Sequence, residues 1–461
     1  MPAHPIDFET QAHVFSTPEM VRIFDEKTRF ARWLQFEAAL ARTQAELGII
    51  PLAAAAEIEA QADLSRIDLE LVKKGYQEGR NSLIPLLHGL RQACCDGYGE
   101  FVHYGATTQD VIDTAQVLEI KETLAIIFRD LRTLEAMLIG KAQQYKSVPM
   151  IGRTHGQQAM PITFGLKVAG WLAEVRRHLE RIKSLAGRVL IGQLHGAVGT
   201  RAALGVHARE VATKTLARLG LGCDIIGWHT ARDNIAEVIT FFALLTATLA
   251  RIANEIFELS KTELGELVEQ APPKAMSSST MPHKNNPVLC QRIIVLARHI
   301  RAQAGVVIEG MIHEHERDGR SLWAEWLAVP QACIYTGAAL HLLNQVLSGL
   351  LVRTNRMQEN LLLQKEMVLS EWLLFRFAAS MGKMRAQQTL HELFRKSRET
   401  GSPVRELITQ DPELRPLLDS HDLAILDQPG LYIGQAEQMV EDLLQIITIK
   451  RQGDPEELAR S

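Results

Sequence analysis

Cysteine is scarce in this sequence. Five of 461 residues are cysteines, and the one adjacent pair is consecutive, without the C-x-x-C spacing of a zinc knuckle or a dithiol redox centre. The five are Cys94, Cys95, Cys223, Cys290 and Cys333. We therefore expect free thiols in a reducing cytoplasm, no metal site and no bound cofactor.

An excess of charge of either sign is also missing. The net charge of −4 gives no general reason to expect nucleic acid or an anionic membrane as a partner. The most apolar run, 238–250, stops at Arg251, short of the ~20 residues that span a bilayer. Residues 1–7 contain no basic segment followed by an apolar stretch, as a secretory signal would. These features predict a soluble, cytoplasmic protein with no membrane or nucleic-acid partner.

Helical periodicity is what the sequence has in abundance. Apolar positions alternate steps of three and four at Trp33, Phe36, Leu40, Thr43 and Leu47. Strand signals are weak throughout the chain. The sequence therefore predicts an all-α protein.

A longer pattern marks one helix as the centre of a bundle. It keeps the same alternation at Val238, Phe242, Leu245, Leu249, Ile252, Ile256 and Leu259. No Gly or Pro interrupts 233–264, which allows one rod of roughly 45–50 Å at ~1.5 Å per residue. Phe241, Leu244 and Ala247 lie off this stripe, so we expect the rod to be buried on most sides, in a bundle or against other subunits.

Breaks in the helical pattern define three helical domains. We predict an N-terminal domain at 1–111, a central long-helix bundle at 112–364 and a C-terminal domain at 365–461. Three segments rich in Gly, Pro, Ser or Thr interrupt the helical pattern, and they contain the polar side chains that are candidates for a functional site: 103–110, 152–161 and 271–287.

The third segment precedes an apolar helical pattern that starts at Val288. A loop that enters a helix offers free backbone N–H groups and the positive end of the helix dipole, which suits a carboxylate or an enolate. A Ser- and Pro-rich segment on its own is more often a linker. The close spacing of Met281-Pro282-His283-Lys284-Asn285-Asn286-Pro287 argues against a linker here.

This segment resembles the fumarase/aspartase superfamily signature Gly-Ser-Ser-x-Met-Pro-x-Lys-x-Asn, with Ser277 in place of the first glycine. The resemblance implies that Ser278 is the general base on a mobile loop, with Ser279 beside it in a supporting role. It also implies that Lys284 and Asn286 hold the substrate carboxylate.

Two further segments are similar to the remaining active-site strips of that superfamily. His103 to Asp110 resembles the Thr-Ser-x-Asp strip, and 152–157 resembles the Thr-His-x-Gln strip. The resemblance implies that His155 handles the leaving group. It further implies a set of substrate ligands: Thr107, Thr108, Gln109, Thr154 and Gln157. To these we add an amide of the N-terminal domain, Asn81.

The residue types agree with one mechanism. A carbanion next to a carboxylate is doubly charged, so its site must be dense in fixed donors. A serine is a poor base unless the same field stabilises its alkoxide. Superfamily members are homotetramers with composite sites, and we expect the same of this chain: strips from different subunits around a small dicarboxylate or tricarboxylate.

The branch of the superfamily is less sharply defined. The chain is similar to adenylosuccinate lyases and 3-carboxy-cis,cis-muconate cycloisomerases from end to end, and Gly79 to Leu86 and His315 to Asp318 are closer to the cycloisomerase pattern. Yet His155 is present, which bacterial cycloisomerases lack. The glutamate that partners this histidine in the lyases is replaced by Gln291, which can orient an imidazole but cannot stabilise its charged form.

The leading hypothesis is a lyase that cleaves a substituted succinate, through a C–N or related bond, by anti β-elimination to fumarate or a close analogue. An N-substituted aspartate or a nitro-succinate fits the weakened histidine. One alternative is a lactonising cycloisomerase, which performs the same reaction within one molecule. The other is a non-catalytic helical scaffold.

Overall fold

The computed structural model describes residues 6, 8, 10–79, 81–271, 280, 281 and 283–458. Their α-helices are α1 (Pro18–Phe24), α2 (Glu26–Glu46), α3 (Leu52–Gln61), α4 (Leu69–Glu78), α5 (Ile84–Ala93), α6 (Thr108–Gln144), α7 (Phe164–Val189), α8 (Ala208–Arg218), α9 (Asp233–Leu259), α10 (Val288–Glu309), α11 (Gly319–Ser348), α12 (Thr354–Leu361), α13 (Ser370–Met381), α14 (Lys383–Thr400), α15 (Val404–Gln410), α16 (Ser420–Asp427) and α17 (Ala436–Gln452). Short 3-10 helices are η2 (Ala12–Val14), η3 (Leu64–Arg66), η4 (Tyr98–Phe101), η5 (Ala202–His207), η6 (Lys365–Leu369), η7 (Arg415–Leu417) and η8 (Pro429–Leu431). The predicted all-α fold is confirmed.

Strands among the described residues form three two-stranded sheets. An antiparallel hairpin joins β1 (Pro149–Thr154) to β2 (Gln157–Thr163). The other two pairs are β3 (Ile191–Gly192) with β4 (Gly222–Cys223), which are parallel, and β5 (Leu267–Val268) with β6 (Leu351–Val352), which are antiparallel. The hairpin was not predicted, because Gly152 and Pro161 obscure the short strand pattern around it.

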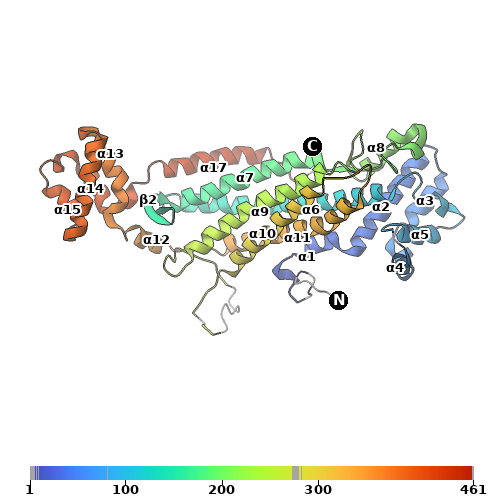
Figure 1. The fold of residues 1–461 in the computed structure, drawn as a ribbon, viewed down its shortest axis with the longest axis horizontal. Helices are drawn as coiled ribbons and strands as arrows, with labels where there is room; N and C mark the ends of the chain where they lie inside the picture. Colours follow the sequence, from blue (N-terminus) through green and yellow to red (C-terminus); the bar gives the residue numbers. More distant parts are fainter. Residues whose placement is uncertain are drawn as a thin grey trace.

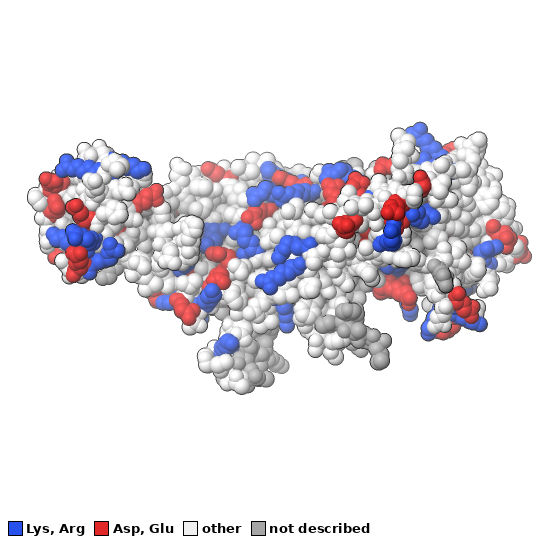
Figure 2. All heavy atoms as spheres, viewed as in Figure 1, with Lys and Arg blue, Asp and Glu red and all other residues white. Residues whose placement is uncertain are grey.

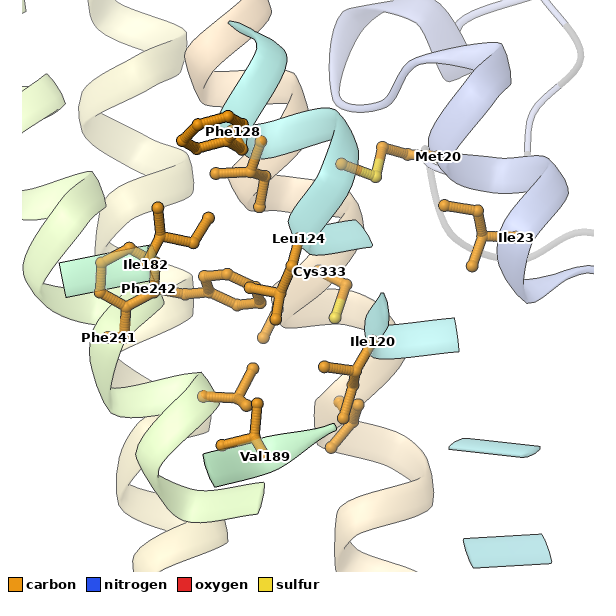
Figure 3. Packing of buried hydrophobic residues seen from close by; sticks show 14 of the residues in the cluster. Met20, Ile23, Ile120, Leu124, Phe128, Ile182, Val189, Phe241, Phe242 and Cys333 are labelled. Carbon is orange, nitrogen blue, oxygen red and sulfur yellow. The ribbon is translucent and has the colours of Figure 1, made fainter. Parts of the chain in front are cut away.

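Five long helices, α6, α7, α9, α10 and α11, lie side by side as the rods of a bundle (Figure 1). Their facing sides are apolar: Leu124 and Phe128 of α6, Ile182 of α7 and Phe242 of α9 meet in one core (Figure 3). The predicted stripe of α9 is confirmed, since all seven of its residues are buried. Leu244, off that stripe, is 54% exposed in the single chain, which leaves it available for the predicted burial against another subunit.

Two of these rods, α9 and α11, are long and apolar enough to cross a membrane by length and composition alone. Most of the apolar window of each is buried in the bundle, 61% in α9 and 67% in α11. Core helices of a helical bundle have this character, so the burial accounts for their apolar composition.

The N-terminal helices α2 to α5 and α8 cover one end of the bundle, and α12 to α16 form a smaller unit at the other end with its own apolar core (Figure 1). The predicted C-terminal domain, 365–461, is divided between two cores. Helix α17 returns along α7, and its Val440 and Ile447 are buried in the core of the bundle. On the face drawn in Figure 2, acidic and basic side chains are interspersed.

A buried ionic cluster holds the N-terminal parts of α6, α9 and α11 together. Arg232, fully buried, donates to both carboxylate oxygens of Asp113 at 2.8 and 3.1 Å and to Glu325 at 2.6 and 2.9 Å. Its guanidinium also lies 4.8 Å from the ring centre of Trp228. Pairing on every side offsets the cost of burying these charges and keeps the three helix ends in register.

Candidate active site

The first strip lies where α6 begins, beside the N-terminal helices. Thr107 is the N-cap residue, and its backbone N–H donates to the Asp110 carboxylate at 3.0 Å. Thr108 is half-buried, and its hydroxyl lies 3.4 Å from Nδ2 of Asn81. The structure therefore brings together three of the predicted substrate ligands: Asn81, Thr107 and Thr108.

Asp110 links this strip to two distant segments. Its buried carboxylate accepts hydrogen bonds from the backbone N–H groups of His195 and Gly196, at 2.9 and 3.0 Å. It also lies 3.0 Å from Nε2 of His229. The sequence motif contained this aspartate, but nothing in the sequence indicated that it would fix the segment at 195–201 against the start of α6.

Gln109, another predicted substrate ligand, is hydrogen-bonded within the chain. Its side chain is buried, and Nε2 donates to Asp113 at 3.1 Å and to the carbonyl of His229 at 2.9 Å. Its Oε1 accepts from Nε of Arg317 at 2.7 Å. Both N–H donors of this amide and one lone pair of its oxygen are used inside the chain, so Gln109 is in a position to orient other groups.

Arg317 is a functional candidate that the sequence reasoning missed. Besides the bond to Gln109, its Nη2 donates to the carbonyl of Ala197 at 2.9 Å, and its side chain remains exposed. An exposed guanidinium fixed at two points is suited to bind a carboxylate. The one available signal was that Arg317 belongs to the cycloisomerase-like motif at 315–318. The sequence did not show that this motif lies next to the first strip in the folded chain.

The second strip forms the turn of the β1–β2 hairpin. Thr154 pairs with Gln157 across the ladder, and the two residues between them have positive φ, 51° for His155 and 77° for Gly156. All three predicted side chains of this strip, Thr154, His155 and Gln157, are exposed. The turn therefore presents the histidine outward on a short, rigid support. Histidine is one of the residues that tolerate positive φ.

The third strip is only partly described. Ser278 and Ser279 lie outside the described residues. Lys284 is exposed, and Asn286 is half-buried just before α10. Gln291 is exposed in the first turn of α10, and no hydrogen bond joins it to His155 within the described part of this chain.

The expectation that α10 offers free backbone N–H groups to a ligand is wrong for its first turn. The carboxylate of Glu269 accepts from the N–H groups of Leu289 and Cys290, at 2.8 and 2.9 Å. The N–H of Val288 donates to the carbonyl of Asn286. An internal carboxylate therefore caps this helix, and a substrate acid group must find its donors elsewhere in the strip.

The hairpin and the third strip belong to the same end of the bundle. Arg153 of β1 forms a two-point ion pair with buried Glu266, at 2.6 and 3.1 Å, just before β5. β5 pairs with β6, which follows α11. The first strip lies beside the N-terminal helices at the other end of α6.

Comparisons with known proteins cover nearly the whole chain. A family model described as Lyase matches residues 13–302. The N-acetyl-S-(2-succino)cysteine lyase of Dickeya dadantii (strain 3937) is 37% identical over 444 residues, which are 96% of this chain and 98% of that protein. The adenylosuccinate lyase of Methanocaldococcus jannaschii is 34% identical over 454 residues, 98% of this chain and 97% of that protein.

A solved structure agrees with these relatives. The 3-carboxy-cis,cis-muconate lactonizing enzyme from Pseudomonas putida superposes with a TM-score of 0.87 at 33% sequence identity, covering 94% of this chain and 97% of that one. The likeness therefore includes the N-terminal helices, the bundle and the C-terminal helices together.

Proposed function

This chain belongs to the fumarase/aspartase superfamily of lyases, and we propose that it removes a leaving group from a substituted succinate by anti β-elimination, giving fumarate or a close analogue. The family predicted from the third strip is confirmed, as is the prediction of an enzyme. Both relatives are lyases whose names describe succinate-bearing compounds. This supports a small diacid carrying a leaving group as the substrate.

The observation that carries the proposal is that the first and second strips lie at opposite ends of one long helix, α6. Thr107 caps the first turn of α6, and the hairpin that holds His155 starts at Pro149, shortly after the last residue, Gln144. A helix of 37 residues is about 55 Å long at ~1.5 Å per residue. One chain cannot close both ends of that helix around a single small diacid, so the geometry supports a site built from several copies.

Exposed apolar side chains on the bundle support the same assembly. α9, α10 and α11 carry large hydrophobic residues that are 40–73% exposed in the single chain: Leu244, Val295, Val306, Ile308, Trp323 and Leu327. Burying such residues between copies would stabilise an oligomer. An antiparallel neighbour would bring the hairpin end of one bundle to the threonine end of another. We infer a homotetramer with composite sites, acting in the cytoplasm as a soluble enzyme.

The proposed chemistry divides proton transfer and substrate binding among the three strips. Ser278 takes the proton from the carbon next to a substrate carboxylate, and the electrons of that C–H bond become the second bond of the product alkene. Lys284 and Asn286, with the hydroxyls of Thr107 and Thr108, hold the carboxylates while the doubly charged intermediate exists. Thr154 and Gln157 complete the substrate contacts beside the histidine.

His155 is proposed to give a proton to the leaving group, which departs with the electrons of its bond to carbon. Its position on an exposed turn lets it enter a site on a neighbouring copy. Gln291 would orient this histidine from another subunit, as a hydrogen-bond partner without charge. That arrangement favours a leaving group that needs little protonation.

Two experiments test the composite lyase. Ser278→Ala should abolish release of fumarate from substituted succinates, followed by ultraviolet absorbance, while the oligomer remains intact by light scattering. Mixing His155→Ala subunits with Thr108→Ala subunits under conditions of subunit exchange should restore activity, because some sites then hold neither substitution. Full activity of Ser278→Ala, or no recovery from mixed subunits that have exchanged, would contradict the proposal.

The runner-up is a lactonising cycloisomerase, favoured by the motifs at 79–86 and 315–318 and by the likeness to the Pseudomonas putida enzyme. Interconversion of a carboxymuconate and its lactone, without fumarate from any substituted succinate, would identify it. An intact oligomer inactive on both substrate panels would instead favour the scaffold.

A further inference from the structure

A cavity of about 930 Å³ lies between the N-terminal helices α1, α2 and α4 on one side and the N-terminal parts of α6 and α11 on the other. Aromatic rings line one side of it. The ring of Phe30 lies 5.3 Å from that of Trp33 and 6.1 Å from that of Tyr76, centre to centre, so that the three form one continuous wall. Trp326 of α11 also lines the cavity. None of these four aromatic residues belongs to the three strips.

The cavity continues from the threonine strip along α6. Ile112, Gln116 and Glu119 line it, and they follow Thr108 by four, eight and eleven positions. At 3.6 residues per turn these residues share one face of the helix with Thr108. Ser82, which also lines the cavity, follows Asn81, the residue in contact with the Thr108 hydroxyl. A group attached to a diacid held at Thr108 therefore has this space beside it.

The charges in the cavity cancel. Its lining includes three bases, Lys27, Arg29 and Lys73, and three acids, Glu26, Glu70 and Glu119. Arg29 binds both carboxylate oxygens of Glu119, at 2.8 and 2.9 Å, and Lys73 lies 3.8 Å from Glu70. A phosphate requires a surplus of cationic donors, which this lining does not have. Flat apolar groups, in contrast, pack well against aromatic rings.

We propose that this cavity receives the leaving group, and that the leaving group is an uncharged aryl amine or aryl thiol. The inference rests on the proposed elimination and names its substrate class. The electrons of the C–N or C–S bond pass to the heteroatom, which gains a proton. The released aryl amine or thiol stays in the cavity until both products leave the site. The volume is within the roughly 300–1,000 Å³ of typical small-molecule sites.

The kinetic test compares two substrates that differ only in the leaving group, N-phenylaspartate and N-methylaspartate, in two variants. Trp326→Ala opens the aromatic lining, and Phe375→Ala is the control, an aromatic residue of α13 that is 55% exposed and lies outside the cavity. Trp326→Ala should lower kcat/KM for the phenyl substrate about tenfold relative to the methyl substrate. The ratio should stay unchanged in Phe375→Ala. Because both substrates are measured with the same variant, a loss of folded enzyme lowers both values equally and leaves their ratio unchanged.

Equal ratios in both variants would overturn the proposal. So would cleavage of adenylosuccinate, which carries a phosphate, more efficiently than N-phenylaspartate by the wild-type enzyme.

A binding test separates the cavity from the reaction. 1-Naphthylamine, which is uncharged at neutral pH and fluorescent, is titrated into the wild-type enzyme and both variants. Weaker binding in Trp326→Ala than in Phe375→Ala supports the aryl cavity even if no aspartate is cleaved, in which case the elimination alone fails. Equal binding in all three proteins overturns the cavity whatever the enzyme catalyses.

Discussion

Arg317 Nε donates to Gln109 Oε1 at 2.7 Å across 208 positions of sequence. This bond fixes an exposed guanidinium over the first turn of α6, next to the threonines of the first strip. From this geometry we infer that Gln109 positions Arg317, and that the Arg317 guanidinium binds a substrate carboxylate alongside the donors of the strips.

Replacing this arginine tests that assignment. Arg317→Lys should raise KM for the diacid about tenfold with a smaller effect on kcat, because lysine lacks the planar fork that makes both bonds. Gln109→Met should reproduce the rise in KM while Arg317 is intact. Arg320→Lys, three positions further on in the first turn of α11 and paired with Asp318, is the control. The same KM in Arg317→Lys and in the control would remove Arg317 from the site.

The cap on α10 predicts a measurable loss of stability. Glu269→Ala removes the acceptor of two N–H groups, and should lower the free energy of unfolding by about 1–2 kcal/mol. Hydrogen exchange should become faster at Leu289 and Cys290. Glu263→Ala, an exposed acid of the preceding loop, should change neither quantity. Unchanged exchange at both amides in Glu269→Ala would show that the carboxylate does not cap the helix.

Two substitutions at His155 distinguish the role of its side chain in catalysis from the effect of its positive φ on the turn. Asparagine tolerates positive φ, so His155→Asn should keep the hairpin and its thermal midpoint while kcat falls about 100-fold or more. His155→Val should also destabilise the turn by about 1–2 kcal/mol, because a β-branched residue is strained at φ 51°. Thermal denaturation and steady-state kinetics on both variants check this. Wild-type kcat in His155→Asn would exclude a catalytic role.

Buried His195 predicts how stability depends on pH. Burial, and then the nearby charge of Arg201, lower the pKa of His195 from 6.5 to about 4. The unfolded chain therefore binds more protons than the folded chain between those values. The contribution of His195 to stability is complete above pH 6.5 and is lost progressively as the pH falls toward 4.

Urea denaturation across that pH range measures the effect. His195→Gln should reduce the slope of the unfolding free energy against pH without abolishing it, because burial lowers the pKa of His178 to about 4 as well. Exposed His207→Gln should leave the slope as in the wild type. An unaltered slope in His195→Gln would mean that this histidine does not contribute to it.

Local sequence patterns were sufficient to predict the helices and which of their faces are buried. The stripe of α9 is buried where its periodicity predicted, and Thr17 caps α1 by accepting from the N–H of Met20 at 3.2 Å. Periodicity and capping depend on residues within a few positions of each other, which a sequence displays directly. The hairpin escaped prediction because its two strands are short and contain a glycine and a proline.

For the site, the sequence by itself indicated the candidate residues, since the signature at 277–286 is a local string, and the relatives agree with the family that it indicates. Where these candidates lie, and what holds them, depends on tertiary structure. Gln109 is turned inward and held by three partners, Glu269 closes the end of α10 from another segment, and Arg317 reaches the first strip from 208 positions away. Hydrogen bonds between distant segments form only when the bundle brings helix ends together, and no local pattern records that packing.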